Sequence, residues 1–359
     1  MIGSIAGLFV LLMIILSIGV SILAVVGAPF AQRFTAGMTP REGLALRFAV
    51  VTAACTFALL VIGGVVSATG SGLACPDWPS CYGSFFPRMA GPIFFEHGHR
   101  LFATLVGCLT TLNIVLVFRA RPAGHPARAL AVGAFPLVVM QGVLGGLTVK
   151  MKLPPAVTIL HLSTAMAFFS VLWWMVFRLR SRTVDFPLAP RVRAAVAGTT
   201  LLVYAQIVLG ALVRHTNSAL VCTAWPFCKD VAATMTPLGA PADDPQIVIH
   251  MAHRVLAVLV GIAVVSTSIT VLRASAANRA ARLLALVAPG LVIVQIFLGM
   301  MSVMTAKDVL TVTAHLGVGA LLLASMVCML LASFAVSADV VALEPTAAAR
   351  GTTWTEARA

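Results

Sequence analysis

The chain has 359 residues, of which 60% are hydrophobic and only 10% are charged, and its mean hydropathy is +1.04. Water-soluble domains carry charge on about a quarter of their residues, so this composition excludes an ordinary soluble protein. The net charge of +13 does not indicate a nucleic-acid partner, because the 24 Lys and Arg residues lie between long apolar runs rather than in one patch.

Apolar runs predict nine transmembrane helices. A helix needs roughly 20 apolar residues to cross a bilayer, so nine helices with short loops use most of the chain. The runs lie at approximately 5–28, 46–66, 97–118, 130–149, 155–177, 194–213, 250–272, 283–303 and 309–334. We therefore expect an all-α polytopic membrane protein with no room for a large soluble domain.

The first run could be mistaken for a secretory signal, because the small residues Ala28 and Ala31 lie near its end. A signal peptide carries basic residues before its apolar run, whereas the first basic residue here is Arg33, after the run. We interpret residues 1–45 as an extra, uncleaved N-terminal transmembrane helix followed by a cytoplasmic loop.

Basic residues are distributed unevenly among the loops, and this predicts the orientation. Fourteen lie in alternate loops and only six in the intervening ones. The fourteen are Arg33, Arg41, Arg47, Arg119, Arg121, Arg128, Arg178, Arg180, Arg182, Arg191, Arg193, Arg273, Arg279 and Arg282, and the six are Arg88, Lys150, Lys152, Arg214, Lys229 and Lys307. The positive-inside rule places the fourteen in the cytoplasm, the N-terminus outside, and the polar tail 336–359 in the cytoplasm.

An internal repeat divides the remaining eight helices into two halves. At an offset of 154, residues 93–107 match residues 247–261 at seven of fifteen positions, and the same offset pairs His161 with His315. At an offset of 147, the loop 69–81 matches 216–228. Each copy contains four helices, residues 46–180 and 193–335, and an even number of helices makes the copies parallel rather than inverted repeats. The predicted architecture is therefore two parallel four-helix bundles plus the N-terminal helix.

Four of the eight histidines fall inside predicted helices at repeat-related positions: His99, His161, His253 and His315. The predicted bounds place His99 and His253 in the first turn of their helices and the other two about six residues in, so all four lie near the outer side. Two neutral imidazoles facing each other across a bundle can be axial ligands of haem iron. Interhelical hydrogen bonding by each histidine is the alternative, and the repetition of the pairs disfavours it.

The common depth of these histidines argues against a cytochrome that conducts electrons across the bilayer, because conduction needs haems at two depths. His97, His125 and His215 are expected to have solvated or capping roles instead.

Two C-x₅-C pairs, Cys75/Cys81 and Cys222/Cys228, lie in predicted outer loops. In an oxidising compartment such pairs form disulfides, and both a loop staple and a redox role stay open. Zinc binding by one pair is disfavoured, because a closed structural zinc site takes four ligands.

The halves differ beside the first histidine of each pair. Glu96, His99 and Arg100 share a helix face, whereas the second copy has His250, His253 and Arg254. Glu96 is a candidate acid or base, or it caps the helix start or pairs with Arg100. The changed neighbour suggests that one haem site does chemistry and the other holds a cofactor. Arg100 and Arg254 are candidates for contacts with haem propionates or for snorkelling to the surface.

These motifs together resemble those of the haem A synthase family. The resemblance covers about residues 46–335 and rests on GSGLACPDWPSC, EHGHR, the 141–161 segment, the second cysteine loop, HMAHR and TAHLG. In that family eight helices form two four-helix halves, so the extra N-terminal helix is a departure.

The resemblance implies a role for each candidate residue. His253 and His315 would ligate a resident haem b in the C-terminal half, and His99 and His161 would bind the substrate, haem O, in the N-terminal half. Glu96 would be catalytic, and Cys75 and Cys81 match the functional cysteine pair of the family.

The implied reaction is the oxidation of a methyl group of haem O to the formyl group of haem A, in two successive two-electron steps, for cytochrome c oxidase assembly. The implied location is a bacterial-type inner membrane, with haem O synthase as a partner, and homo-oligomerisation is left open. A membrane thiol–disulfide oxidoreductase would explain the cysteines but not the histidines. A non-catalytic haem-binding electron-transfer protein or carrier would explain the histidines.

Overall fold

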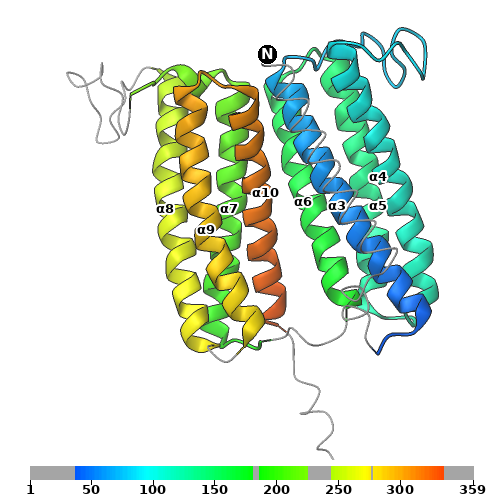
Figure 1. Cartoon of the computed structure of the whole chain (residues 1–359), viewed down its shortest axis with the longest axis vertical. Helices are drawn as coiled ribbons and strands as arrows, with labels where there is room; N and C mark the ends of the chain where they lie inside the picture. The colour runs from blue at the N-terminus through cyan, green and yellow to red at the C-terminus, as the bar shows by residue number, and fades with distance from the viewer. Residues whose placement is uncertain (1–36, 181–185, 225–243, 276–277, 335–359) are drawn as a thin grey trace, which may run out of the picture.

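A computed structural model describes residues 37–180, 186–224, 244–275 and 278–334 of the chain (Figure 1). Eight long α-helices run through these residues: α3 (Pro40–Ala68), α4 (Pro92–Ala120), α5 (Pro126–Lys150), α6 (Pro155–Leu179), α7 (Pro190–His215), α8 (Pro245–Ala274), α9 (Arg279–Met304) and α10 (Val309–Ala332). A short 3₁₀ helix, η1 (Ser218–Leu220), follows α7.

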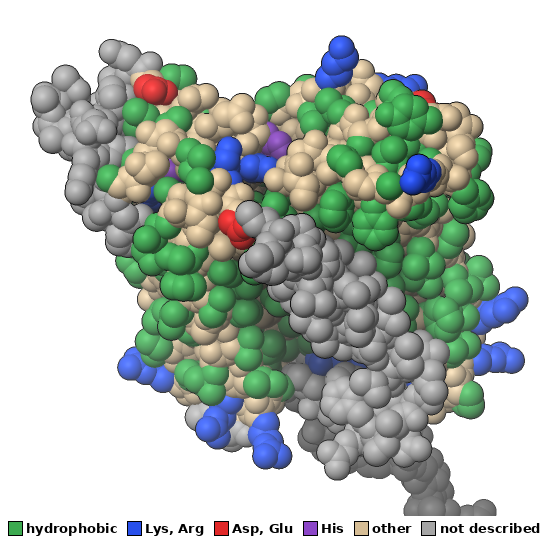
Figure 2. Space-filling model, turned by 45° about the horizontal axis from the view of Figure 1, so that its top comes forward, with side chains coloured by type: hydrophobic (Ala, Val, Ile, Leu, Met, Phe, Trp, Pro, Cys, Tyr) green, Lys and Arg blue, Asp and Glu red, His purple; other side chains and the backbone are tan. Residues whose placement is uncertain are grey.

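All eight helices are long and apolar enough to cross a membrane, which confirms the prediction of an all-α polytopic membrane protein. Figure 2 shows hydrophobic side chains over the flanks of the molecule, with Lys and Arg side chains gathered toward its two ends. The predicted helix at 5–28 and the predicted tail at 336–359 lie outside the described residues.

Several helices begin earlier than their apolar runs. Six of the eight start with proline, whose fixed φ and missing N–H suit the first helical position. Because α4 starts at Pro92 and α8 at Pro245, His99 lies seven residues into its helix and His253 eight. The predicted first-turn positions of these two histidines were therefore wrong.

The helices pack as two antiparallel four-helix groups, α3 to α6 and α7 to α10 (Figure 1). In each group consecutive helices are in contact, and the first helix also contacts the last. The connection between α5 and α6 has positive φ at Lys152 and Leu153, and the connection between α9 and α10 has it at Ala306 and Lys307. These residues correspond in the two copies, so the repeat extends to the conformation of its turns.

The two bundles meet along α3 and α6 on one side and α7 and α10 on the other. Gly64 of α3 lets α10 approach closely, since a Cβ there would come 2.9 Å from Cδ2 of Leu316. Near one end of this interface, the Arg214 guanidinium of α7 donates to the Ser67 carbonyl of α3 at 2.7 Å. One apolar core fills the first bundle, and a second fills the other bundle and reaches Phe169 of α6.

Candidate functional site

Each of the four predicted histidines faces a glycine on the preceding helix. A Cβ on Gly63, Gly145, Gly210 or Gly299 would come 3.1, 3.5, 3.0 or 3.1 Å, respectively, from Cε1 of His99, His161, His253 or His315. In each bundle, a glycine of the first helix leaves room for the histidine of the second helix, and a glycine of the third helix leaves room for the histidine of the fourth helix. Four equivalent glycine–histidine contacts show that the sequence repeat also holds in the packing.

The four histidines lie at the same end of the molecule. Each is six to eight residues from the start of its helix, which is about 9–12 Å along the axis at 1.5 Å per residue. The loop between α3 and α4, which contains Cys75 and Cys81, is at this end as well. Within each bundle the two imidazoles are near enough to interact electrostatically, His99 with His161 and His253 with His315.

In the second bundle both imidazoles have hydrogen-bonding neighbours. The Gln206 amide nitrogen lies 3.1 Å from Nδ1 of His253 and also donates to the His253 carbonyl at 3.0 Å. Nδ1 of His315 lies 3.1 Å from the backbone oxygen of Gln295, to which it can only donate, so Nε2 carries the lone pair. The Gln295 side-chain amide lies 3.4 Å from that Nε2 and can donate to it.

In the first bundle the corresponding imidazoles lack such neighbours. Nδ1 of His99 and Nδ1 of His161 are both buried and have no hydrogen-bond partner. Gln141, which corresponds to Gln295, donates its amide to the Thr164 hydroxyl instead. The two histidine pairs are therefore alike in their glycine contacts and different in their polar surroundings.

Glu96 is buried, with 4% of its surface exposed, and both of its carboxylate oxygens have partners. Oε2 accepts the Cys75 backbone N–H at 2.8 Å, and Oε1 pairs with the Arg100 guanidinium. The expected pairing with Arg100 is confirmed. The capping role is wrong, because Glu96 is the fifth residue of α4 and binds the disulfide loop.

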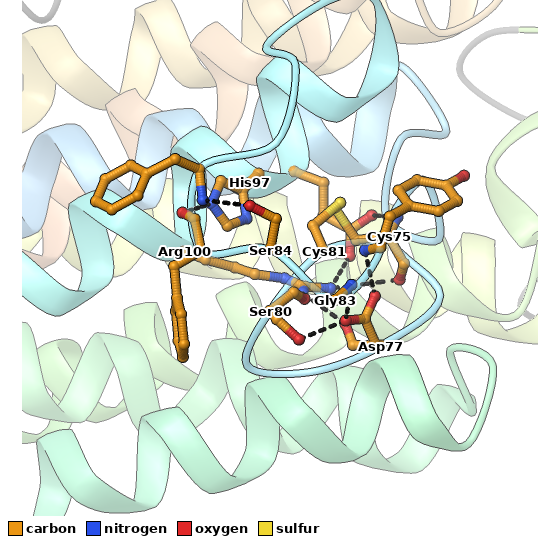
Figure 3. Close-up of a disulfide and its surroundings, with 12 residues drawn as sticks. Cys75, Asp77, Ser80, Cys81, Gly83, Ser84, His97 and Arg100 are labelled. Atoms are coloured by element: carbon orange, nitrogen blue, oxygen red, sulfur yellow. Dashed lines mark hydrogen bonds and ion pairs between the residues drawn. A yellow bond between two sulfur atoms is a disulfide. The ribbon is translucent and has the colours of Figure 1, made fainter.

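Arg100 also fastens the disulfide loop to α4. Its guanidinium donates to the backbone carbonyls of Asp77 and Ser80 at 2.7 and 2.6 Å, as the stick view shows (Figure 3). Cys75 and Cys81 are joined in a disulfide, and both are fully buried. Contact of Arg100 with a haem propionate stays a prediction.

Asp77 organises the tip of the same loop (Figure 3). Its carboxylate accepts the Ser80 hydroxyl and the backbone N–H groups of Tyr82 and Gly83, at 2.6 Å from Tyr82 and 2.9 Å from Gly83. These hydrogen bonds, that from Ser80 foremost, lower the pKa of Asp77 from 3.8 to about 2.

His97 does not have the solvated or capping role that we predicted. It is 2% exposed, its Nε2 lies 2.9 Å from the Phe85 carbonyl, and it is beside the disulfide. The loop between α3 and α4 covers the face of α4 that carries His97, a face that we expected to be exposed to solvent. His125 does cap a helix, because its Nδ1 accepts the Ala127 N–H at the start of α5, and His215 is the last residue of α7.

The second cysteine loop is held in a similar way. Arg254 donates to the backbone carbonyls of Cys222 and Ala224, each at 2.7 Å, and contacts His250, which replaces Glu96, at 3.2 Å. Cys222 is buried, and Cys228, its predicted disulfide partner, lies outside the described residues. For Arg254, too, a propionate contact stays a prediction.

Sequence reasoning missed Gln206 and the role of the glycines. A polar side chain inside an apolar span is an available signal, and Gln206 had that signal. The paired glycines were visible as repeat matches, but a sequence does not show which residue lies across from them. What the site offers chemically is two pairs of imidazoles and one buried carboxylate next to the first pair.

Comparisons with known proteins agree with this arrangement. The chain matches the family described as "Cytochrome oxidase assembly protein" (COX15-CtaA) over residues 46–93 and 90–327. Among curated relatives, a "Heme A synthase" from Symbiobacterium thermophilum is 32% identical over 207 residues, which are 55% of this chain and 65% of the relative. One from Geobacillus kaustophilus is 31% identical over 188 residues, 50% of this chain and 59% of the relative.

A third relative with the same name, from Shouchella clausii, is 30% identical over 275 residues. This match covers 74% of this chain and 88% of that relative. The matches to the other two relatives cover less than two thirds of those proteins. The family match includes both histidine pairs, both cysteine loops and Glu96. The chain therefore belongs to the COX15-CtaA family of cytochrome oxidase assembly proteins.

Proposed function

We propose that this protein is a haem A synthase, which oxidises a methyl group of haem O to the formyl group of haem A for cytochrome c oxidase assembly. The observation that carries the proposal is the set of four histidines, two in each bundle, each facing a glycine at repeat-related positions. The name shared by the curated relatives supports the same reaction.

The two halves would have different tasks. His253 and His315 would ligate a resident haem b in the half 193–335, and His99 and His161 would bind the substrate haem O in the half 46–180. The donor set fits haem: the proton of His315 is on Nδ1, which leaves the Nε2 lone pair for iron. In the first bundle the Nδ1 atoms of both histidines have no hydrogen-bond partner, so these two rings are held less firmly than those of the second bundle.

Glu96 would be the catalytic acid or base. It lies three residues before His99, on the same helix face, and Arg100 and the Cys75 N–H hold both of its oxygens in place. The carboxylate would accept protons released at the methyl carbon as that carbon is oxidised. When bound, the haem irons supply the redox chemistry. The disulfide loop over the start of α4 keeps water from Glu96.

The proposed orientation in the membrane follows from the distribution of basic residues among the loops. We place the protein in a bacterial-type inner membrane, with the disulfide loop outside and the C-terminus in the cytoplasm, because Arg residues concentrate in the opposite loops. Haem O synthase, which would supply the substrate, is a proposed partner. A homo-oligomer is a further open proposal.

A thiol–disulfide oxidoreductase is less well supported, because thiol exchange needs an accessible sulfur and both Cys75 and Cys81 are fully buried. The loop-staple interpretation of this pair accounts for the burial. A non-catalytic haem carrier shares the histidines, and in a carrier Glu96 would serve only to bind Arg100 and the disulfide loop.

The test is to produce the protein in membranes that contain haem O and to separate the extracted haems b, o and a by chromatography. We expect haem A in the parental membranes and none in the His99→Ala and His161→Ala variants. His253→Ala should lack the resident haem b spectrum. Haem O that is bound and recovered unchanged would identify a carrier, and a preparation without Soret absorbance would favour the oxidoreductase.

A further inference from the structure

We infer that Gln206 is a positioning residue that makes the second bundle the one that retains its haem. The inference rests on the proposed function, because it takes His253 to be a haem ligand. Gln206 is on α7, and its side-chain amide reaches across to His253 on α8, where it contacts both the ring and the backbone. No comparable amide contacts His99 in the described part of the first bundle.

The repeat shows that this contact is specific to the second bundle. The residue that corresponds to Gln206 in the first copy is Leu59, an aliphatic side chain without hydrogen-bonding groups. A second difference between the copies places an amide beside the other histidine of the pair. Thr164 binds the amide of Gln141, whereas its counterpart Val318 leaves the amide of Gln295 to His315. Two substitutions between the copies thus direct both amides toward the histidines of the second bundle only.

A physical reason connects these contacts to haem retention. A histidine that binds a metal through Nε2 carries its proton on Nδ1, and a hydrogen-bond partner for that proton fixes the ring and makes it a better ligand. For His315 the backbone oxygen of Gln295 is this partner. For His253 the ring is held differently, because the Gln206 amide nitrogen lies 3.1 Å from Nδ1 and donates to the His253 carbonyl at 3.0 Å, so this side chain restricts both the ring and the backbone that carries it.

The first bundle lacks these constraints, since Nδ1 of His99 and Nδ1 of His161 are both without a partner. Weakly oriented ligands suit a site that has to admit haem O and release its product. The asymmetry between Gln206 and Leu59 therefore matches a division into a retaining site and an exchanging site.

The experiment measures how fast purified holoprotein loses haem b to an excess of apomyoglobin. Gln206→Leu, which installs the residue of the first copy, should lose haem b roughly 10–100-fold faster than the parent, the range typical of second-shell changes at metal sites. Gln206→Met, closer in shape, should do the same, so the test does not depend on one variant folding.

Leu59→Gln is the matched control, because it makes the reverse change in the first bundle and should leave the loss of haem b unchanged. Parental loss rates in both Gln206→Leu and Gln206→Met would overturn the inference, and so would equal acceleration by Leu59→Gln. His253→Ala separates this failure from that of the proposed function. If His253→Ala lacks haem b while the Gln206 variants behave like the parent, only the role of Gln206 is wrong. If His253→Ala retains haem b, the proposed division of the halves is wrong.

Discussion

Gly210 and His253 lie so close that a Cβ on the glycine would come 3.0 Å from Cε1 of the imidazole. Real Cβ atoms rarely have contacts this short, so any larger residue at position 210 has to displace the ring or the helix. The same relationship recurs at Gly63, Gly145 and Gly299, with distances of 3.1–3.5 Å. The histidine rings are thus placed by the absence of a side chain on the neighbouring helix.

Gly210→Ala should therefore disturb the resident haem site. Overpacking of this kind typically costs about 1–3 kcal/mol, and here it would be relieved by moving the His253 ring. We expect a shifted Soret band and a reduced haem b content in the purified protein. Gly198→Ala is the control, since it is on the same helix and a Cβ there meets nothing within 4 Å. A parental spectrum in Gly210→Ala would contradict this account.

Glu96→Gln should abolish the formation of haem A while both haems still bind. The amide keeps the size of the side chain and one acceptor for the Cys75 N–H, but it cannot take up a proton at neutral pH. The measurements are haem chromatography for the product and absorbance for binding. Glu42→Gln is a matched control, because Glu42 is also paired with an arginine, Arg121, but at the opposite end of the bundle. Haem A made at the parental rate by Glu96→Gln would refute the catalytic role.

Much of the fold follows from the sequence for a simple physical reason. Bilayer thickness sets the length of an apolar run, and the repeat pairs the helices, so eight spans in two halves could be predicted together with His99, His161, His253 and His315. Helix starts were predicted less well at α4 and α8. Their first turns contain polar residues such as Glu96 and His250, and only the proline at the first position marks the start.

The features of the site that the sequence did not predict depend on contacts between segments that are distant in the chain. The burial of His97 comes from a loop folding over α4, and a helix-face argument from the sequence does not include that loop. Gln206 has Leu59 as its repeat partner, so the residues that the two copies share do not include it. Functional differences between repeats lie at the positions where the copies disagree.

Arg100→Gln should loosen the disulfide loop. The substitution removes the guanidinium that binds two loop carbonyls and Glu96. The fully buried disulfide should then become accessible, and we expect its reduction by a water-soluble dithiol to be at least about tenfold faster, as bonds to charged groups contribute roughly 1.5–3 kcal/mol. Reduction is followed by thiol alkylation and mass spectrometry. Arg88→Gln, an exposed arginine in the same loop, should leave the rate unchanged. Equal rates in all three proteins would show that Arg100 does not hold the loop.

Acid should release the tip of this loop in a pH range set by Asp77. Its pKa is about 2 in the folded protein and 3.8 without these contacts, so the folded loop favours the carboxylate. The stabilisation is complete above about pH 4 and is lost as the pH falls toward 2, because protonation removes the acceptor for the N–H groups of Tyr82 and Gly83. Amide hydrogen exchange at these two residues, corrected for the intrinsic effect of pH, should lose protection in that window. In Asp77→Asn the protection should be low at neutral pH and should not change between pH 4 and 2. A wild-type transition centred well above pH 4 would assign the effect to another group.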